Sequence, residues 1–592
     1  MSRIAGLVVL AALMALVAAF PAGAQVDAPP KTPTAEGRGG SAATVDPLAT
    51  QAAIDVLRSG GNAVDAAVAA AGVLGVVEPF SCGIGGGGFM VIYDAKRRRV
   101  DTIDSREAAP AAVEPDVFLG PDGEPLPFEQ ARVSGLSVGV PGTVAGWEKA
   151  LNRYGTRSLR SLLRPGERIA REGFVVDDVF AGQVESNADV FDDFTSSRET
   201  YLTGAGTAPP AGSVHRNLDM ADTYARIRQN PDSFYRGPIA RDIAQTVQHP
   251  PEAPDSDREV AAGEMTPRDL ARYEAIRREP TKVGYRGLEV YGMGPPSSGG
   301  STVGEALNII EGYRPLGATR DQALHRYLEA SKLAYADRGE YLADPAYEDV
   351  PLRGLLSDAF ARDRRALIRD DSVLPAPQPA HPDPYRYEHR HGHGKRAGTG
   401  DNGKSTTHLT VADRWGNVVS YTFTIEAIGG SGIVVPDRGF LLNNELTDFN
   451  FQTETANSPD GGKRPRSSMA PTIVLDGRRP VVALGSPGGA TIITTVLQVL
   501  VHHLDFGMPL PDAVAAPRAS QRNAASTQAE QRFIDLYGPA LSAPPRSHTF
   551  TVAPPPGELG AVAAIGFGRH DRQQAVAEPT RRGGGSAMVV RP

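Results

Sequence analysis

Apolar and β-branched positions predict a β-hairpin about two-thirds of the way along the chain. Two such runs, 409–411 and 418–423, lie on either side of the stretch 413–417. Asp, Gly and Asn in that stretch are typical of a tight turn between antiparallel strands. Pairing the runs about this turn brings Thr406 opposite Thr424. We therefore expect two hydroxyl groups side by side, an arrangement that also occurs in sheets for structural reasons alone.

Helical periodicity and capping residues predict two consecutive helices near the N-terminus. Asp46 is expected to cap a helix with Pro47 at its first position, and the glycines after Ser59 to end it. Asn62 is expected to cap an alanine-rich second helix that packs closely against a neighbouring layer. Further elements are predicted as strands at 89–93 and 480–484 and as helices at 324–335 and 490–504.

Two stretches rich in proline, glycine and charge, 25–40 and 376–403, are predicted to be flexible. The second contains His389, His391 and His393. A flexible loop is favoured over a metal site because no carboxylate or thiol spacing completes a ligand set.

The second stretch leads directly into Thr406, which suggests a cleavable junction between Ser405 and Thr406. A threonine exposed as a new N-terminus carries its own base, because its free amino group can take the proton from the hydroxyl as it attacks a carbonyl. An ordinary loop before a strand is the alternative.

The first 24 residues are typical of a signal peptide. Arg3 precedes the apolar run 4–20, and Ala22-Gly23-Ala24 has the small residues of a cleavage site. An uncleaved membrane anchor is less favoured, because Pro21 ends the run and no basic stop-transfer cluster follows. We expect an exported protein, periplasmic or extracellular, with no membrane anchor after signal removal.

Composition narrows the function classes. The chain of 592 residues has a formal net charge of −8, which gives no basic footprint for nucleic acid. Cys82 is the single cysteine, so neither an intramolecular disulfide nor a cysteine-based metal site can form. It is expected to be a small packing residue.

A glycine-rich loop, 485–489, stands between a predicted strand and a predicted helix. Backbone N–H groups in such a loop can bind an anion or the oxyanion of an acyl-transfer intermediate. A phosphate-binding loop would need Gly-Lys-Ser/Thr, which does not follow the glycines. An ordinary turn between a strand and a helix, without a binding function, is the other alternative. Arg106 and the segments 443–449 and 463–469 carry charges that could hold a carboxylate and an ammonium group, or lie on the surface.

In their order and their residues, these motifs resemble those of the γ-glutamyltransferases over nearly the whole mature chain. The motifs that carry the resemblance are 60–67, 85–89, Arg106-Glu107, 296–300, 406–408, 443–449, 464–469 and 485–489. The resemblance implies an α/β fold, the four-layer αββα sandwich of the N-terminal-nucleophile hydrolase superfamily. It also implies a precursor that cuts itself into a large subunit, 25–405, and a small subunit, 406–592, which remain together as a heterodimer. No metal or organic cofactor is implied.

The resemblance also assigns expected roles. Thr406 corresponds to the nucleophile, Thr424 to its supporting hydroxyl, and Gly488 and Gly489 to the oxyanion hole. The positions that correspond to substrate binding are Arg106, Ser467 and Ser468 for the α-carboxylate and Glu426, Glu445 and Asp448 for the α-amino group.

Two departures from many family members point to the bacillus-type branch. Glu426 stands where many members have Asn, and Glu445 where many have Gln. The stretch between Phe449 and Lys463 is too short for the lid loop that many members place over the site. An open site should admit bulkier donors such as polyglutamate and favour hydrolysis beside transfer.

The resemblance therefore implies a γ-glutamyltransferase/hydrolase. Its donors would be glutathione and related γ-glutamyl compounds, and its acceptors water, amino acids or peptides. A glutaryl-cephalosporin acylase of the same fold is the first alternative and an inactive secreted binding protein a remote one. The acids expected around the α-amino group argue against the acylase. A glutaryl group lacks the amine and would leave Glu426 and Asp448 without a partner.

Overall fold

The computed structural model describes residues 29–382 and 405–591. The predicted signal peptide, the three histidines at 389–393 and most of the stretch 376–403 lie outside the described residues.

Thirteen of the described strands form a largely antiparallel sheet that folds over on itself, and the others form two smaller sheets. Strand β1 (Thr34–Thr44) joins its two halves: residues 34–37 pair with β17, whereas the rest pairs with β9 and β18. In spatial order the strands are β6 (Ile276–Arg278), β3 (Arg99–Ser105), β2 (Gly87–Asp94), β10 (Val418–Thr424), β9 (Thr407–Asp413), β1, β17 (Gln573–Ala577), β16 (Ala563–Phe567), β12 (Arg479–Gly485), β11 (Thr472–Asp476), β8 (Leu288–Gly292) and β7 (Thr281–Tyr285), with β18 (Ser586–Arg591) beside β1.

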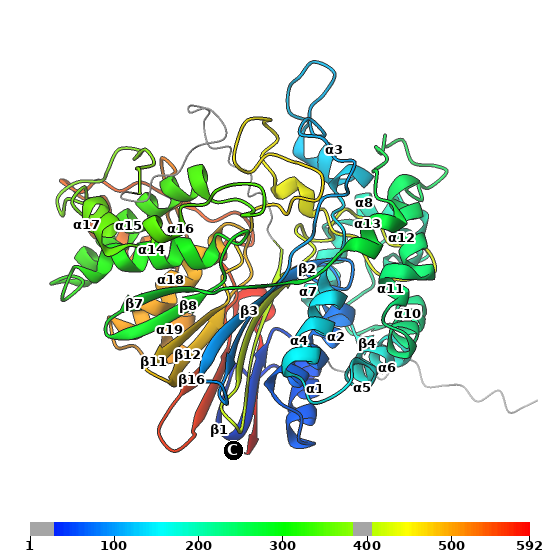
Figure 1. Cartoon of the computed structure of the whole chain (residues 1–592), viewed down its shortest axis with the longest axis horizontal. Helices are drawn as coiled ribbons and strands as arrows, with labels where there is room; N and C mark the ends of the chain where they lie inside the picture. Colours follow the sequence, from blue (N-terminus) through cyan, green and yellow to red (C-terminus); the bar gives the residue numbers. More distant parts are fainter. Residues whose placement is uncertain (1–28, 383–404, 592) are drawn as a thin grey trace, which may run out of the picture.

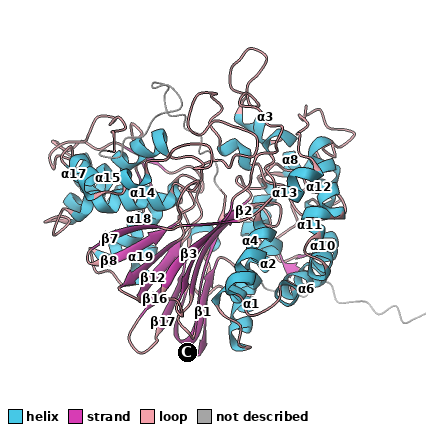
Figure 2. Ribbon diagram, in the orientation of Figure 1, coloured by secondary structure: helices cyan, strands magenta, loops and turns pink. Residues whose placement is uncertain are grey.

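Helices cover both outer faces of the folded sheet, so the chain has four layers (Figures 1 and 2). The first layer packs on β9 and β10, the second on β7, β8 and β12, and β9 and β10 face β12 and β16 between them. The first layer includes α1 (Pro47–Arg58), α2 (Ala63–Val77), α4 (Thr143–Tyr154), α6 (Arg164–Glu172), α10 (Leu218–Gln229) and α12 (Pro238–Gln248). The second includes α14 (Gly299–Glu311), α15 (Arg320–Tyr341), α18 (Thr491–Leu504) and α19 (Leu510–Ala515). The expected αββα sandwich is confirmed.

Capping chemistry fixes the starts of α1 and α2 as the sequence predicts. The Asp46 carboxylate accepts from the N–H groups of Leu48 and Ala49. Asn62 and Asp65 form a capping box. All fifteen residues of α2 are buried, in keeping with its alanine-rich sequence and its close packing against the sheet. The predicted strands at 89–93 and 480–484 and the predicted helix at 324–335 lie within β2, β12 and α15, and the predicted helix at 490–504 matches α18 to within one residue.

The prediction of a flexible linker at 25–40 is wrong for residues 34–40. The prolines before residue 34 and the glycines at 37, 39 and 40 are typical of a linker, so the sequence does not reveal this strand. In the structure, β1 has pairing partners along both its edges. Pairing of this kind overrides the low strand propensity of glycine and alanine. Within the described residues, no helix combines the length and the apolar character needed to cross a bilayer.

His408 connects the two inner layers. Its Nδ1 bonds Thr422 and its Nε2 bonds Thr410, whose hydroxyl donates to the carbonyl of Ala563 on β16. A Cβ added at Gly485 would collide with the imidazole ring. Burial lowers the pKa of His408 to about 3, so this histidine is neutral and serves packing.

Candidate active site

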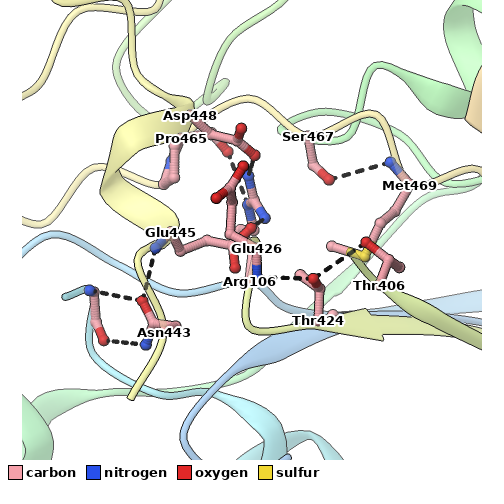
Figure 3. Close-up of polar contacts among 12 residues, drawn as sticks. Arg106, Thr406, Thr424, Glu426, Asn443, Glu445, Asp448, Pro465, Ser467 and Met469 are labelled. Carbon is pink, nitrogen blue, oxygen red and sulfur yellow. Dashed lines mark hydrogen bonds and ion pairs between the residues drawn. The ribbon is translucent and has the colours of Figure 1, made fainter. Parts of the chain in front are cut away.

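The β9–β10 hairpin places the two threonines as predicted. Thr407 pairs with Phe423, so Thr406 lies opposite Thr424. The Thr406 hydroxyl donates to Thr424 Oγ1 at 3.1 Å, and Thr424 Oγ1 also accepts from the Glu426 N–H at 2.8 Å (Figure 3). Thr406 is only 4% exposed. A hydroxyl at the start of a buried strand is therefore held in one orientation by its neighbour.

The backbone at Thr406 is strained. Its φ is 141°, a value that L side chains rarely adopt, and its Cβ is branched. Such a conformation costs about 1–3 kcal/mol and persists only where surrounding contacts hold it. Arg582 Nη1 donates to the Thr406 carbonyl at 2.7 Å, and the Ser405 hydroxyl donates to the carbonyl of Phe80 at 3.2 Å. Both residues of the junction are thus fixed to other parts of the fold.

The glycine loop 485–489 leaves β12 and opens α18, as the sequence predicts. Gly488 and Gly489 have φ values of 133° and 55°, which favour glycine. Among the described residues, neither N–H donates to a protein acceptor. Two unengaged donors therefore lie in a loop whose last glycine lines the cavity at Thr406.

One small cavity, of about 20 Å³, brings together all the candidate residues except Gly488. Gly488 lines a second cavity, which shares no lining residue with the first. The lining of the first cavity comprises Arg106, Ser405, Thr406, Thr424, Glu426, Glu445, Asp448, Ser467, Ser468, Met469, Gly489 and Ile492. Residues far apart in the sequence thus converge on the threonine pair.

Arg106 is completely buried and crosses this cavity. Its Nη1 donates to Glu445, and its Nη2 donates to Asp448 at 2.5 Å (Figure 3). The carbonyls of Pro465 and Arg466 accept from the same guanidinium. Four of its five N–H donors are thus engaged by protein acceptors.

The carboxylates exceed the charge that Arg106 supplies. Glu426 Oε1 and Glu445 Oε2 are buried and have no hydrogen-bond partner among the described residues. Asn444 donates to the other oxygen of Glu426. Burial, and then the charge of Asp448, raise the pKa of Glu426 to about 8. An ammonium ligand would satisfy these oxygens and favour the ionised form.

Ser467 and Ser468 lie beside this charged group on a braced segment. Arg338 donates from Nη2 to Ser468 Oγ and from Nε to Ser298 Oγ, both at 2.8 Å. Ser298 in turn donates to the carbonyl of Ser467. Sequence reasoning missed Arg338. The motif 296–300 was the available signal, because it lies directly against the serine segment.

Asn443 and Asn444 belong to the motif 443–449, in which the resemblance assigns them no role, and both position site residues. Asn443 Nδ2 donates to the carbonyls of Gly85 and Gly139, and its Oδ1 accepts from the Glu445 N–H. Asn444 orients Glu426, as described above. The pair thus holds two of the acids in place.

Residues 450–462, where no lid was expected, form a short loop held against neighbouring segments. Asn457 donates to the carbonyl of Asp448 and accepts from the Arg466 N–H. Phe451 stacks on Phe118 with ring centroids 4.5 Å apart. The expectation of an open, lid-free site stays a prediction.

His325, Glu329 and His548 form a buried cluster that could hold a metal ion. The two imidazoles hydrogen-bond each other at 2.7 Å, and Lys332 pairs with Glu329 at 3.4 Å. These ligand atoms therefore already have protein partners, and a metal would have to displace an ammonium group.

Comparisons with known proteins give matches that extend over most of the chain. The family model for gamma-glutamyltranspeptidase matches residues 49–588. The glutathione hydrolase proenzyme of Bacillus subtilis (strain 168) is 39% identical over 521 residues, covering 86% of each chain. That of Escherichia coli (strain K12) is 38% identical over 493 residues, covering 81% of this chain and 80% of its own. The crystal structure of cephalosporin acylase from Bacillus halodurans has a TM-score of 0.81 at 28% identity, covering 95% and 98%. The chain therefore belongs to the gamma-glutamyltranspeptidase family.

Proposed function

We propose that this chain is a self-processing γ-glutamyltransferase/hydrolase that acts on glutathione and related γ-glutamyl amides. The observation that carries the proposal is the pair of buried, unpartnered carboxylate oxygens on Glu426 and Glu445, which line one cavity with the Thr406–Thr424 pair. A hydroxyl nucleophile beside sites for an ammonium group and a carboxylate fits the zwitterionic end of a γ-glutamyl donor.

Processing begins when Thr406 Oγ1 attacks the carbonyl carbon of Ser405. The C–N bond breaks, the Thr406 nitrogen takes the proton, and water then hydrolyses the resulting ester. Ser405 keeps a carboxylate and Thr406 gains a free amino group. The strained φ of Thr406 favours this step, because the constraint disappears with the peptide bond.

The sheet explains why the two products would stay together. β1 of the large subunit lies between β9 and β17 of the small subunit, and β7 and β8 extend the sheet beyond β11. Separation would break hydrogen-bonded ladders in several places and expose both inner faces. We therefore propose a heterodimer of 25–405 and 406–592, exported by means of the signal peptide 1–24, which is then removed.

In the catalytic cycle, the Thr406 amino group takes the proton from Oγ1 as the oxygen attacks the γ-carbonyl carbon. The N–H groups of Gly488 and Gly489 stabilise the oxyanion. The amino group then protonates the leaving amine, and a γ-glutamyl ester remains on Thr406. Water or an acceptor amine attacks this ester and restores the hydroxyl. An unperturbed α-amino group has a pKa of about 8, which suits a base near neutral pH.

The charged residues orient the donor. Arg106, with the hydroxyls of Ser467 and Ser468, would bind the α-carboxylate, and Glu426, Glu445 and Asp448 would surround the α-ammonium. The likeness to a cephalosporin acylase keeps a side-chain acylase as the second candidate. Glutaryl groups have no amine, so the unpartnered acids favour the first candidate.

The test is Thr406→Ala. The variant should run as a single uncleaved chain on a denaturing gel and release no nitroaniline from a γ-glutamyl anilide. Thr407→Val is the matched control, because its hydroxyl has no hydrogen-bond partner among the described residues, and it should be cleaved and active. Cleavage at the same junction in the alanine variant would refute the mechanism.

A further inference from the structure

Four hairpin turns of the large sheet are rich in basic residues, although the whole chain has a formal net charge of −8. They join β2 to β3 (94–99), β9 to β10 (413–417), β11 to β12 (476–479) and β16 to β17 (568–572). Four aspartates also lie in these turns, and two of them, Asp94 and Asp413, are buried. The basic residues number nine: Lys96, Arg97, Arg98, Arg99, Arg414, Arg478, Arg479, Arg569 and Arg572.

Hydrogen bonds hold the turns side by side. The Ala95 N–H donates to Asn417 Oδ1 at 3.0 Å, and the Tyr93 hydroxyl donates to the carbonyl of Arg478 at 2.6 Å. The first residue of β17 donates from its side-chain amide to the carbonyl of Asp413 at 3.1 Å. Turns from both inner layers therefore form one surface. We call the four turns together the basic turn surface.

This surface lies at the end of the sheet opposite the active site. Thr424, which accepts from Thr406, pairs with Gly87 at the start of β2, whereas the 94–99 turn follows the other end of that strand. In the same way, β12 runs from the turn 476–479 to the glycine loop 485–489. The surface is at the lower end of the sheet in Figure 1, where the C-terminus lies. A partner bound there would leave the cavity at Thr406 uncovered.

Most of the cations on this surface are available to a partner. Eight of the nine are exposed and Arg99 is half-buried. Three of them, Arg97, Arg99 and Arg572, pair with carboxylates. The other six have no ion-pair partner in the part of the chain that the structure describes: Lys96, Arg98, Arg414, Arg478, Arg479 and Arg569.

An exposed tryptophan stands among these cations. Trp415 is 49% exposed in the β9–β10 turn, and the guanidinium of Arg414 lies 4.3 Å from the centroid of its ring. Indole rings favour the boundary between water and hydrocarbon, because they are apolar and carry one N–H donor. A soluble polyanion such as polyphosphate offers the ring no apolar layer. Cations around a tryptophan therefore fit the surface of an anionic bilayer better.

We propose that the basic turn surface docks this protein on membranes that contain anionic phospholipids. The six unpaired cations lie against the phosphate headgroups, and Trp415 enters the interface. The attraction is electrostatic, so it weakens as the ionic strength rises. The proposal goes beyond the proposed reaction, because it involves neither the cavity at Thr406 nor its ligands.

The chain carries its own reporter of docking. Of its two tryptophans, Trp147 is fully buried, so Trp415 alone can respond to a lipid surface. Purified protein without residues 1–24 is mixed with vesicles of phosphatidylcholine, with or without phosphatidylglycerol. With phosphatidylglycerol, the emission should shift to shorter wavelength and acrylamide quenching should decrease. Phosphatidylcholine alone should produce neither change. Cosedimentation gives the partition coefficient, which should fall as salt is added.

Two triple variants that remove the same charge locate the surface. The test variant combines Arg98→Gln, Arg414→Gln and Arg478→Gln. It should partition roughly 100-fold more weakly, because each cation near an anionic surface contributes about a factor of five. The control changes one exposed arginine on each of α6, α10 and α12, as Arg168→Gln, Arg226→Gln and Arg241→Gln, and should partition as the wild type does. Equal thermal midpoints of the three proteins verify the fold.

Several results would overturn the proposal. Wild type that does not bind anionic vesicles at low salt would do so, and equal weakening in both variants would assign binding to net charge alone. Unchanged acrylamide quenching in vesicle-bound protein would show that another surface binds. Tighter binding to polyphosphate than to vesicles would identify a soluble polyanion as the partner instead.

Discussion

Glu426→Gln tests most directly whether a carboxylate of the site binds the α-ammonium group of the substrate. The carboxyl of Glu426 is 4% exposed, one of its oxygens has no partner in the described part of the chain, and burial raises its pKa to about 8. Glutamine keeps the shape and can still accept from Asn444. The substitution therefore removes the negative charge offered to the substrate and changes little else.

The size of the effect follows from a single charge-assisted hydrogen bond. Such a bond contributes about 1.5–3 kcal/mol, so kcat/KM for a γ-glutamyl donor should fall roughly 10- to 150-fold. A glutaryl donor has no amine and gains nothing from the carboxylate. Its kcat/KM should stay the same, because without an ammonium group beside it Glu426 is largely protonated near neutral pH and glutamine replaces a neutral acid.

The assay measures nitroaniline release by processed enzyme from γ-glutamyl and glutaryl 4-nitroanilides. The ratio of the two kcat/KM values removes differences in folding or active fraction. Glu114→Gln, at an exposed position, is the control and should leave the ratio unchanged. An equal loss of kcat/KM on both donors, or a ratio within about threefold of wild type, would show that Glu426 does not bind the α-ammonium group of the donor.

Proton release on ligand binding gives a second readout of the same variant. An arriving ammonium favours the ionised carboxylate, so wild type should release a proton when it binds glutamate below about pH 8. Glu426→Gln should release none from this position. Titration calorimetry in two buffers of different ionisation heat measures the difference.

Two further substitutions address the hairpin. Thr424→Val removes the acceptor of the nucleophile hydroxyl and leaves a buried N–H unpaired. Precursor cleavage followed on gels should slow by about tenfold or more, and an unchanged rate would contradict the supporting role. His408→Gln should flatten the acid dependence of stability. In the wild type, the unfolded histidine binds a proton below about pH 6.5 whereas the folded one stays neutral to about pH 3, so stability falls across that window. Urea midpoints measured from pH 7 to 4 test this, and parallel curves would count against it.

Local chemistry made the hairpin, the helix caps and the glycine loop predictable. Each depends on residues a few positions apart, such as Asn62 with Asp65 or the turn at 413–417. The site residues that come from distant segments and line the cavity at Thr406 could be predicted only from the family resemblance. Strand β1 was missed, because its identity depends on partners more than 350 positions away in sequence. Arg338 and Arg582 were missed for the same reason: each acts through hydrogen bonds to residues far away in the sequence.

The contrast between two buried acids shows how the site differs from the supporting fold. Asp65 accepts hydrogen bonds from Asn62, Thr156 and Arg157, so its carboxylate is fully used in joining α1, α2 and α4. Glu426 has a positive φ of 78°, an unpartnered oxygen and a raised pKa. A fold selected for stability alone would pair that oxygen or replace the acid. The unpartnered oxygen of Glu426 and the strained backbone at Thr406 are therefore best explained by the ligand and the cleavage proposed for this site.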